Sequence, residues 1–178
     1  ELIFLNGHKL KEAIYKYIDL CELGNDCKKW FEEACGVYAT LVDRIVPGFP
    51  HKDIEEIKEK LQYNDQLLVQ AEIFHLWVIE APQEVALEFP AEMAGLNVLF
   101  VPDEKPYHDR KVVLLNGPHT VLSPVAFLSG IDIVREACLD KVVGKYINRV
   151  MCNELLETLD LPKMELDQFA RDVLERFN

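Results

Sequence analysis

Residues 111–120, Lys-Val-Val-Leu-Leu-Asn-Gly-Pro-His-Thr, place three chemically capable side chains in an otherwise apolar stretch. On a straight α-helix, which turns about 100° per residue, His119 would lie near 80° and Asn116 near 140° from Lys111. The apolar side chains between them would point to the other side, where a core could take them. The spacing therefore predicts a helix that carries Lys111, Asn116 and His119 in one polar sector.

These three side chains are suited to moving a proton between an alcohol and a ketone without a metal. A lysine acts as a general base when burial or nearby cations bring its pKa down toward working pH. An asparagine amide donates to a developing alkoxide oxygen, and a histidine orients the lysine or binds a substrate hydroxyl. Pro118 has no N–H, so we expect a kink there that frees backbone groups near the site.

A structural interpretation of the same residues stays open. Lys111 follows Asp109 and Arg110 and could be a solvated lysine. Asn116 and the glycine after it could end a helix, and His119 could be a satisfied core histidine.

Charge and cysteine usage exclude several classes of function. The 178 residues carry a net charge of −12, and a nucleic-acid partner would need a basic patch. The five cysteines are odd in number and none are spaced C-x-x-C, so we expect no disulfide framework, no zinc cluster and a reducing cytoplasm. No apolar run approaches the ~20 residues of a membrane span, and no signal peptide is visible.

The order of the predicted elements divides the chain near residue 104. Strands are predicted at 2–5, 37–46, 67–79 and 98–101, and helices at 9–21, at 52–61 and from a cap at Asn25 or Asp26 to about Ala34. After the turn cluster at 102–106, the sequence pattern of nearly all remaining residues is typical of helices. The pattern predicts the end of an α/β domain over 1–104 and a mostly helical domain over 105–178.

Both ends of the sequence suggest a longer polypeptide. The first methionine is Met93, the chain opens on a strand-like pattern, and it stops within a helix-like one. We therefore expect the remainder of the same polypeptide before Glu1 and after Asn178 to be its partner.

The spacing Lys111-x4-Asn116-x2-His119 resembles the active-site signature of the long-chain polyol dehydrogenases, the mannitol dehydrogenase family. Residues 40–47, Thr-Leu-Val-Asp-Arg-Ile-Val-Pro, and 74–80, Phe-His-Leu-Trp-Val-Ile-Glu, are similar to two further segments of that family. Residues 123–126 and 134–136 look most like its branch that reduces a keto sugar acid in hexuronate breakdown. The resemblance covers nearly the whole chain.

The resemblance implies an NAD-dependent, zinc-independent enzyme that acts on a small sugar acid. Lys111 would be the general acid/base, Asn116 an oxyanion donor, and His119 would position the substrate and the lysine. It also implies that 1–104 is an α/β remnant of a Rossmann-type domain, and that 105–178 is a truncated, mostly α-helical substrate domain.

Three departures limit what the resemblance implies. The family carries a Gly-rich dinucleotide fingerprint, whereas this chain has no G-x-G, so we expect it to bind NAD poorly by itself. Ala39 stands where family members often have an asparagine thought to help hold the oxyanion. The family also continues beyond residue 178 into helices that complete the sugar site.

Four more residues are candidates for substrate binding. Asp43 and Arg44 follow a predicted strand, whose end is where α/β sheets gather ligands, although a structural ion pair fits them equally. Arg44 and Arg110 could bind a substrate carboxylate through bidentate hydrogen bonds. His108 lies three residues before Lys111 on the same helix face, where it could tune the lysine or simply contact solvent.

Two alternatives to the sugar-acid reductase remain. One is a sibling enzyme of the family with another sugar acid or polyol as substrate. The other is a non-catalytic helical interaction module, which the missing fingerprint and Ala39 favour and the intact trio disfavours.

Overall fold

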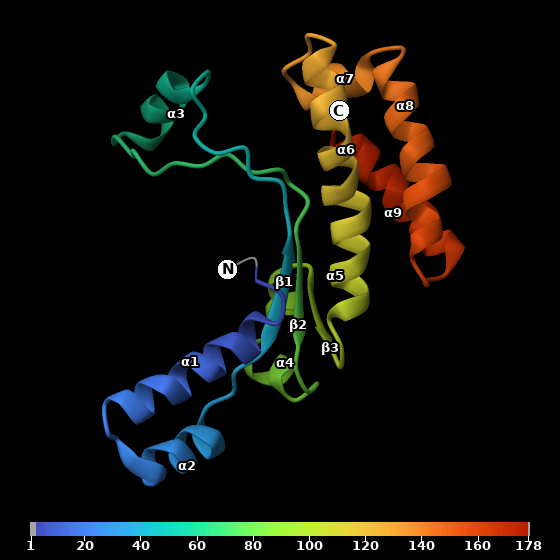
Figure 1. Cartoon of the computed structure of the whole chain (residues 1–178). Helices are drawn as coiled ribbons and strands as arrows, with labels where there is room; N and C mark the ends of the chain where they lie inside the picture. The colour runs from blue at the N-terminus through green and yellow to red at the C-terminus, as the bar shows by residue number, and fades with distance from the viewer. Residues whose placement is uncertain (1–2, 178) are drawn as a thin grey trace. The chain divides into compact units, whose positions relative to one another are not determined.

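The computed structural model describes residues 3–177 as two compact units, Glu1–Glu104 (unit 1) and Lys105–Asn178 (unit 2), and each is described by itself (Figure 1). Unit 1 holds a three-stranded sheet and short helices, and unit 2 is helical. A Rossmann-like α/β segment followed by a mostly helical segment was the fold class expected from the sequence, and it is confirmed.

The sheet of unit 1 consists of β1 (Ala39–Asp43), β2 (Leu76–Glu80) and β3 (Val98–Val101), in that order. β1 pairs antiparallel with β2, whereas β2 and β3 are parallel. The crossover between the parallel strands contains α4 (Val85–Glu88) and a 3₁₀ turn at Ala91–Ala94. Its small apolar core is formed by Ile79, Ala81, Ala91 and Val98.

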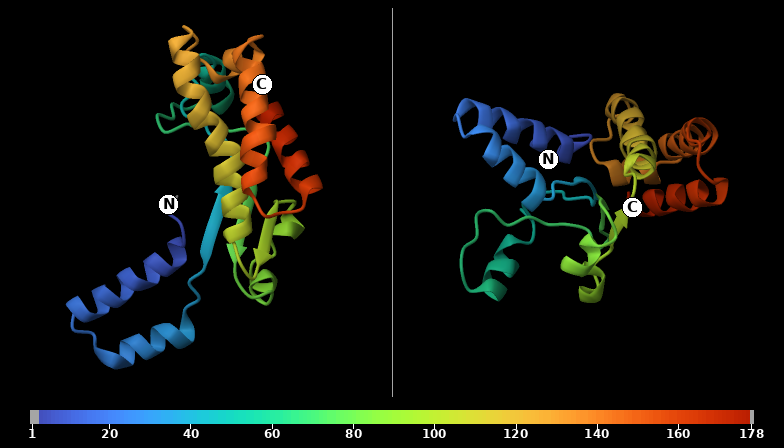
Figure 2. Two further views of the ribbon diagram at one scale, coloured as in Figure 1. Left: turned by 45° about the vertical axis from the view of Figure 1, so that its right-hand side comes forward. Right: turned by 90° about the horizontal axis from the view of Figure 1, so that it is seen from below.

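Two helices form a hairpin before the sheet, α1 (Asn6–Leu20) and α2 (Gly24–Ala34) (Figure 2). Tyr15 of α1 contacts Phe31 of α2 edge to face at 5.8 Å between ring centroids. The predicted helices are confirmed, but the predicted side-chain cap of α2 is wrong, because its cap residue is Leu23 and no side chain bonds there.

The start of α1 is joined to β1 by the side chain of Asn6. Its amide donates to the Thr40 carbonyl and accepts from the Thr40 N–H, both at 2.8 Å. Gly7 approaches the same strand so closely that a β-carbon would lie 2.2 Å from the Tyr38 carbonyl carbon. Ala39 is 2% exposed, so the position where the family resemblance suggested an asparagine is part of the packed core here.

Two predicted strands are wrong. Residues 3–5 form a turn before α1, with Leu5 in the left-handed region, and Leu2 lies outside the described residues. The run at 67–79 is a strand only from Leu76, because the preceding residues pair with no strand of the sheet and form just one isolated bridge, Gly48–Gln70. The charged helix is confirmed as α3 (Ile54–Leu61).

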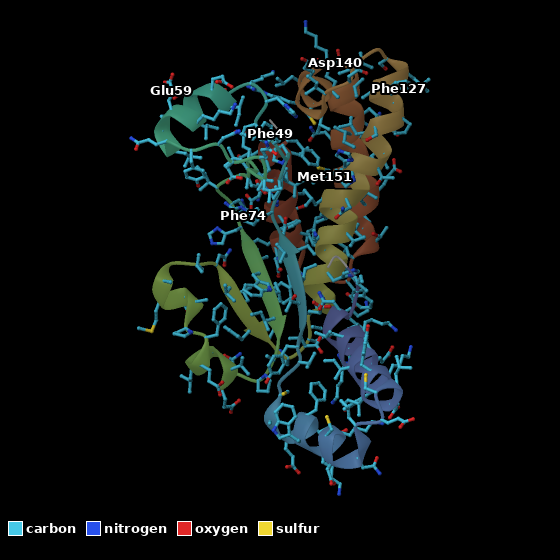
Figure 3. All side chains as sticks on the ribbon, turned by 90° about the vertical axis from the view of Figure 1, so that its left-hand side faces the viewer. Phe49, Glu59, Phe74, Phe127, Asp140 and Met151 are labelled. Carbon is cyan, nitrogen blue, oxygen red and sulfur yellow. The ribbon has the colours of Figure 1, made fainter. Side chains whose placement is uncertain are left out.

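Unit 2 packs its helices around apolar side chains of α6, α7 and α8. The core consists of Leu122, Ala126, Ala137, Val143 and Ile147. Met151 is fully buried among these helices, whereas Phe127 projects outward with 72% of its surface exposed (Figure 3). The helices are α5 (Lys105–Lys111), α6 (Gly117–Leu128), α7 (Val134–Leu139), α8 (Val143–Val150) and α9 (Lys163–Arg176).

Candidate active site

A π-helical turn, Val112–Asn116, joins α5 to α6 in the stretch that carries the candidate trio. The N–H of Gly117 bonds to the carbonyl of Val112, five residues back. The irregularity predicted at Pro118 is therefore a widened turn just before it. In an α-helix the ring of Pro118 would clash with the Leu114 carbonyl, and a wider turn relieves that clash.

The π turn changes the helical geometry from which the site was predicted. It accommodates one extra residue, so every later side chain lags by about 100° relative to a straight α-helix. His119 then lies about 20° from Lys111, two turns or roughly 11 Å along the axis, and Asn116 lies about 40° from Lys111. The trio occupies a narrower sector than the straight helix predicted.

Local contacts differ among the three residues. Lys111 is half-buried, whereas Asn116 and His119 are exposed. The side chains of Asn116 and His119 make no hydrogen bond within residues 3–177. Their backbone carbonyls accept hydroxyl hydrogen bonds, from Thr120 at 2.9 Å and from Ser123 at 2.7 Å. The side-chain amide of Asn116 and the ring of His119 therefore remain available to a ligand on the same side of one helix.

A cavity of about 450 Å³ opens beside His119 on α6 and the start of α7. Its polar lining comes from His119, Ser123 and Asp132, and the rest is apolar. Its volume falls within the usual range for small-molecule sites, roughly 300–1,000 Å³.

His108 lies about one turn before Lys111 on α5, and Asp109 follows it in sequence. The Nδ1 of His108 lies 3.1 Å from a carboxylate oxygen of Asp109. Lys105 donates to the other oxygen, and this bond, followed by the one with His108, holds the pKa of Asp109 below its usual value. His108 therefore has a fixed carboxylate neighbour.

Arg110 points away from the trio, about 100° around the helix from Lys111. Its guanidinium donates to Glu165 of α9, lies 4.5 Å from the ring centroid of Phe169, and has only 12% of its side chain exposed. These contacts join α5 to α9. They give the Arg110 side chain a structural role, and its predicted binding of a substrate carboxylate stays a prediction.

Asp43 and Arg44 lie at the end of β1 in unit 1. Asp43 is 1% exposed and pairs with Leu76 of β2 in the ladder. Arg44 donates through Nε and Nη2 to the Glu72 carbonyl at 2.9 and 2.7 Å, while the Glu72 carboxylate accepts from the Ile45 N–H at 2.6 Å. Arg44 thus fastens the segment before β2. Sequence reasoning missed Glu72, whose partners are distant in sequence.

The described residues do not fit the pyrophosphate of NAD. A dinucleotide cradle needs glycines where a strand turns into a helix, so that the backbone can approach the phosphates. The turns after β2 and β3 are Ala-Pro-Gln-Glu (81–84) and Pro-Asp-Glu (102–104), which hold no glycine and carry acidic side chains. Among residues 3–177 there is also no group of three metal-ligating side chains, and no helix long and apolar enough to cross a membrane.

The sheet with its crossover, followed by a helical unit with a polar trio on one helix, defines a Rossmann-like α/β segment joined to a mostly helical domain. Residues 1–92 match the model of the mannitol dehydrogenase Rossmann domain, and residues 103–178 match that of the mannitol dehydrogenase C-terminal domain. The chain therefore belongs to the mannitol dehydrogenase family, as the sequence motifs suggested.

Relatives within the family include proteins named altronate oxidoreductase. The chain is 80% identical over all 178 residues to that of Phocaeicola vulgatus and 78% identical to that of Bacteroides thetaiotaomicron, in each case covering 37% of the relative. That of Cronobacter sakazakii is 44% identical over 177 residues, and 37% of its length is covered. The resemblance to the sugar-acid branch is confirmed, and the chain spans little more than a third of these relatives' length.

Solved structures show the same fold. A substrate-free D-sorbitol dehydrogenase matches with a TM-score of 0.77 and 27% identity, over 97% of this chain and 35% of that one. A Pseudomonas fluorescens mannitol 2-dehydrogenase, in a ternary complex with NAD and D-mannitol, matches with a TM-score of 0.68 and 24% identity, over 97% of this chain and 34% of that one.

Proposed function

We propose that the protein containing this chain is an NAD-dependent oxidoreductase that interconverts D-tagaturonate and D-altronate in the cytoplasm, without zinc. The observation that carries the proposal is the 80% identity, over the whole chain, to a relative named altronate oxidoreductase. Residues 1–104 would be the end of its dinucleotide-binding domain, and 105–178 part of its helical substrate domain.

In this proposal Lys111 handles the proton of the reaction. During reduction its ammonium gives a proton to the keto oxygen, and during oxidation its amine takes that proton from the hydroxyl. The half-buried position of Lys111 on the same helix as Asn116 and His119 supports this role.

Asn116 and His119 would hold the substrate over the π turn. The Asn116 amide donates to the oxygen on which negative charge develops, and the His119 ring binds a substrate hydroxyl. The narrow sector that the π turn gives the trio supports this arrangement. A linear six-carbon acid lying along the helix would meet all three side chains.

The remaining candidate residues would have lesser roles. His108, with Asp109 beside it, would relay a proton to or from Lys111. Arg44, Arg110 and Asp43 were predicted to bind substrate, and their contacts with Glu72, with Glu165 and in the β1–β2 ladder support structural roles instead. The nucleotide phosphates would be held by residues other than those described.

A substrate panel tests the proposal. The intact protein is assayed for NADH oxidation with tagaturonate, fructuronate and fructose as separate substrates. We expect kcat/KM to be highest for tagaturonate. A preference for fructuronate or fructose would instead assign the chain to a fructuronate reductase or a mannitol dehydrogenase.

A non-catalytic interaction module is the second candidate function. The exposed Phe127 and Leu128 at the end of α6, 72% and 85% exposed, favour it. Absence of turnover with all three substrates, in a protein shown to be folded by circular dichroism, would support the module over the enzyme.

A further inference from the structure

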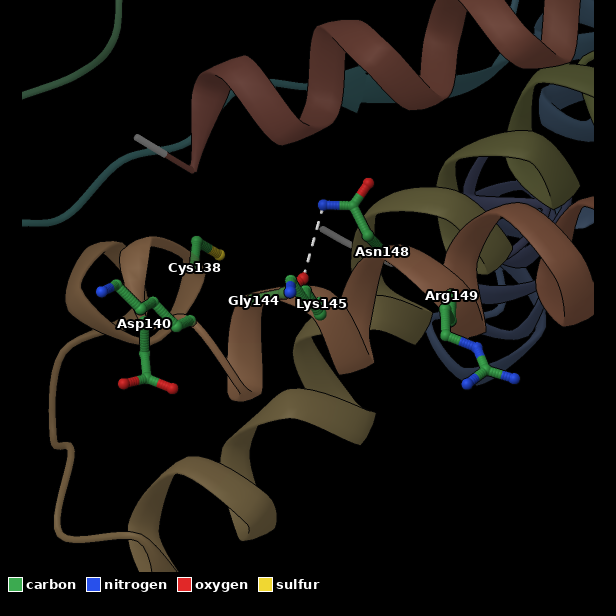
Figure 4. Close-up of a pocket in the computed structure, with 7 residues that line it drawn as sticks. Cys138, Asp140, Gly144, Lys145, Asn148 and Arg149 are labelled. Atoms are coloured by element: carbon green, nitrogen blue, oxygen red, sulfur yellow. Dashed lines mark hydrogen bonds between the residues drawn. The ribbon is translucent and has the colours of Figure 1, made fainter.

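A second cavity of unit 2, of about 470 Å³, is lined mainly by α8 and the turn that precedes it. Its floor is the close contact between α7 and α8 at Gly144, and Asn148 donates to the Gly144 carbonyl at 3.4 Å (Figure 4). Its charged lining residues are Asp140, Lys141, Lys145 and Arg149. The groove is thus basic in a chain whose net charge is −12.

Three basic residues line this groove in a row. Lys145 and Arg149 are four residues apart on α8, which places them on one face about 6 Å apart along the axis. Lys141 lies in the turn that precedes α8 and lines the same groove. All three side chains are exposed and make no hydrogen bond or ion pair with another residue of the described part of the chain. Several other lysines of the described part of the chain do have an acidic neighbour, as in the Lys58–Glu55 and Lys60–Glu56 pairs.

The row of like charges works against the stability of α8. Lys145 and Arg149 form a like-charged pair at i, i+4, which destabilises a helix. Lys141 adds positive charge ahead of the first turn, where the helix macrodipole favours a negative one. An anionic ligand would relieve both costs.

The acidic residue of the groove is already engaged. Asp140 Oδ1 accepts from the backbone N–H groups of Val142 and Val143 at 2.8 and 2.9 Å, which caps the start of α8. The capped N-terminus is therefore not available for a ligand. The row of basic side chains remains available.

We propose that this groove binds a small organic bisphosphate, with Arg149 holding one phosphate and Lys141 and Lys145 the other. The planar fork of an arginine suits two phosphate oxygens, and a lysine supplies a point charge. A ligand with one phosphate reaches only neighbouring members of the row, whereas phosphates at both ends of a sugar can engage all three. The site is independent of the proposed oxidoreductase activity.

Calorimetric titration of the intact protein tests the proposal, at fixed physiological ionic strength. The probe is a fructose bisphosphate phosphorylated at both terminal carbons, with inorganic phosphate as the comparison. We expect one probe molecule to bind per chain, and inorganic phosphate to bind at least about tenfold more weakly. Lys145→Gln and Arg149→Gln should each weaken the probe's Kd about tenfold or more, since each removes a charge-assisted hydrogen bond.

Lys163→Gln is the matched control. Lys163 is exposed at the start of α9, and the substitution makes the same change in net charge. It should alter the probe's Kd by less than about twofold, because Lys163 does not line the groove and exposed charges are screened by salt. Lys145→Gln should leave the melting temperature unchanged or raise it, which excludes unfolding as the reason for lost binding.

Three results would overturn the proposal. They are no binding of the bisphosphate, equal binding of inorganic phosphate, and a loss in Lys163→Gln as large as in the groove variants.

Discussion

A β-carbon on Gly144 would lie 2.2 Å from the carbonyl oxygen of Cys138 and 3.1 Å from its carbonyl carbon. The backbones of α7 and α8 therefore touch at this point, and only a residue without a side chain allows it. This contact sets the position of α8 and, with it, the core residues Val143 and Ile147.

Gly144→Ala should destabilise unit 2 strongly. Because the clash is with backbone, relief requires the two helices to separate, and we expect a loss of about 1–3 kcal/mol or more in the free energy of unfolding. Urea unfolding followed by circular dichroism measures it.

Gly117→Ala is the matched control for that substitution. A β-carbon there would lie 3.4 Å from Leu155 Cδ1, an ordinary contact. Alanine within a helix is favoured over glycine by roughly 0.5–1 kcal/mol, so stability should be kept or rise slightly. Equal losses in the two variants would show that the backbone contact at Gly144 is not what limits the packing.

Arg110→Ala tests whether Arg110 is structural or binds substrate. Its ion pair with Glu165 is only partly buried, and its stacking on Phe169 is lost with the side chain, so we expect about 1–3 kcal/mol of lost stability. In the intact enzyme KM should change less than about twofold, a difference too small for the loss of a charged contact. A large rise in KM with unchanged stability would restore the substrate role predicted from sequence.

The contribution of Asp140 to stability should depend on pH in the acid range. Backbone hydrogen bonds, first from Val143 and then from Val142, hold the pKa of its carboxyl below the usual value. Because the folded-state pKa is depressed, the cap stabilises the protein above the unfolded pKa of about 3.9 and is lost as pH falls through the folded value. As pH falls from about 5 to about 3, the melting temperature of the wild type should therefore fall further than that of Asp140→Asn.

Asp140→Ala completes that comparison, because it has no acceptor for the two N–H groups at any pH. Its melting temperature should lie below that of Asp140→Asn at neutral pH. Identical pH profiles for wild type and both variants would show that this carboxylate does not stabilise α8.

The sequence predicted elements whose pattern and partners lie close together. The helical spacing of apolar residues over 9–21 predicted α1, and the short apolar run at Val98–Val101 predicted β3. The long run at 67–79 failed as a strand because β-propensity says nothing about whether a partner strand is present, and most of that run has none. Glu72, which binds both Arg44 and Ile45, could not be found from spacing.

The candidate trio was predicted from a helix of the wrong type. A straight α-helix spread Lys111, Asn116 and His119 over about 140°, and the π turn narrows that sector to about 60°. Pro118 marked an irregularity, but its form depends on packing. The π turn contacts α9 and a second π turn, Met151–Leu155, which lies some forty residues further along the chain.

The turnover of Lys111→Met in the intact enzyme tests the central claim most directly, with Lys163→Met as its control. Lys163 is an exposed lysine at the start of α9 and has no part in the candidate site, so its variant should keep near-normal kcat. Lys111→Met should lose at least about 100-fold in kcat for tagaturonate reduction, the usual scale for a general acid/base. Near-normal turnover in Lys111→Met would contradict the assignment of Lys111 as the group that moves the proton.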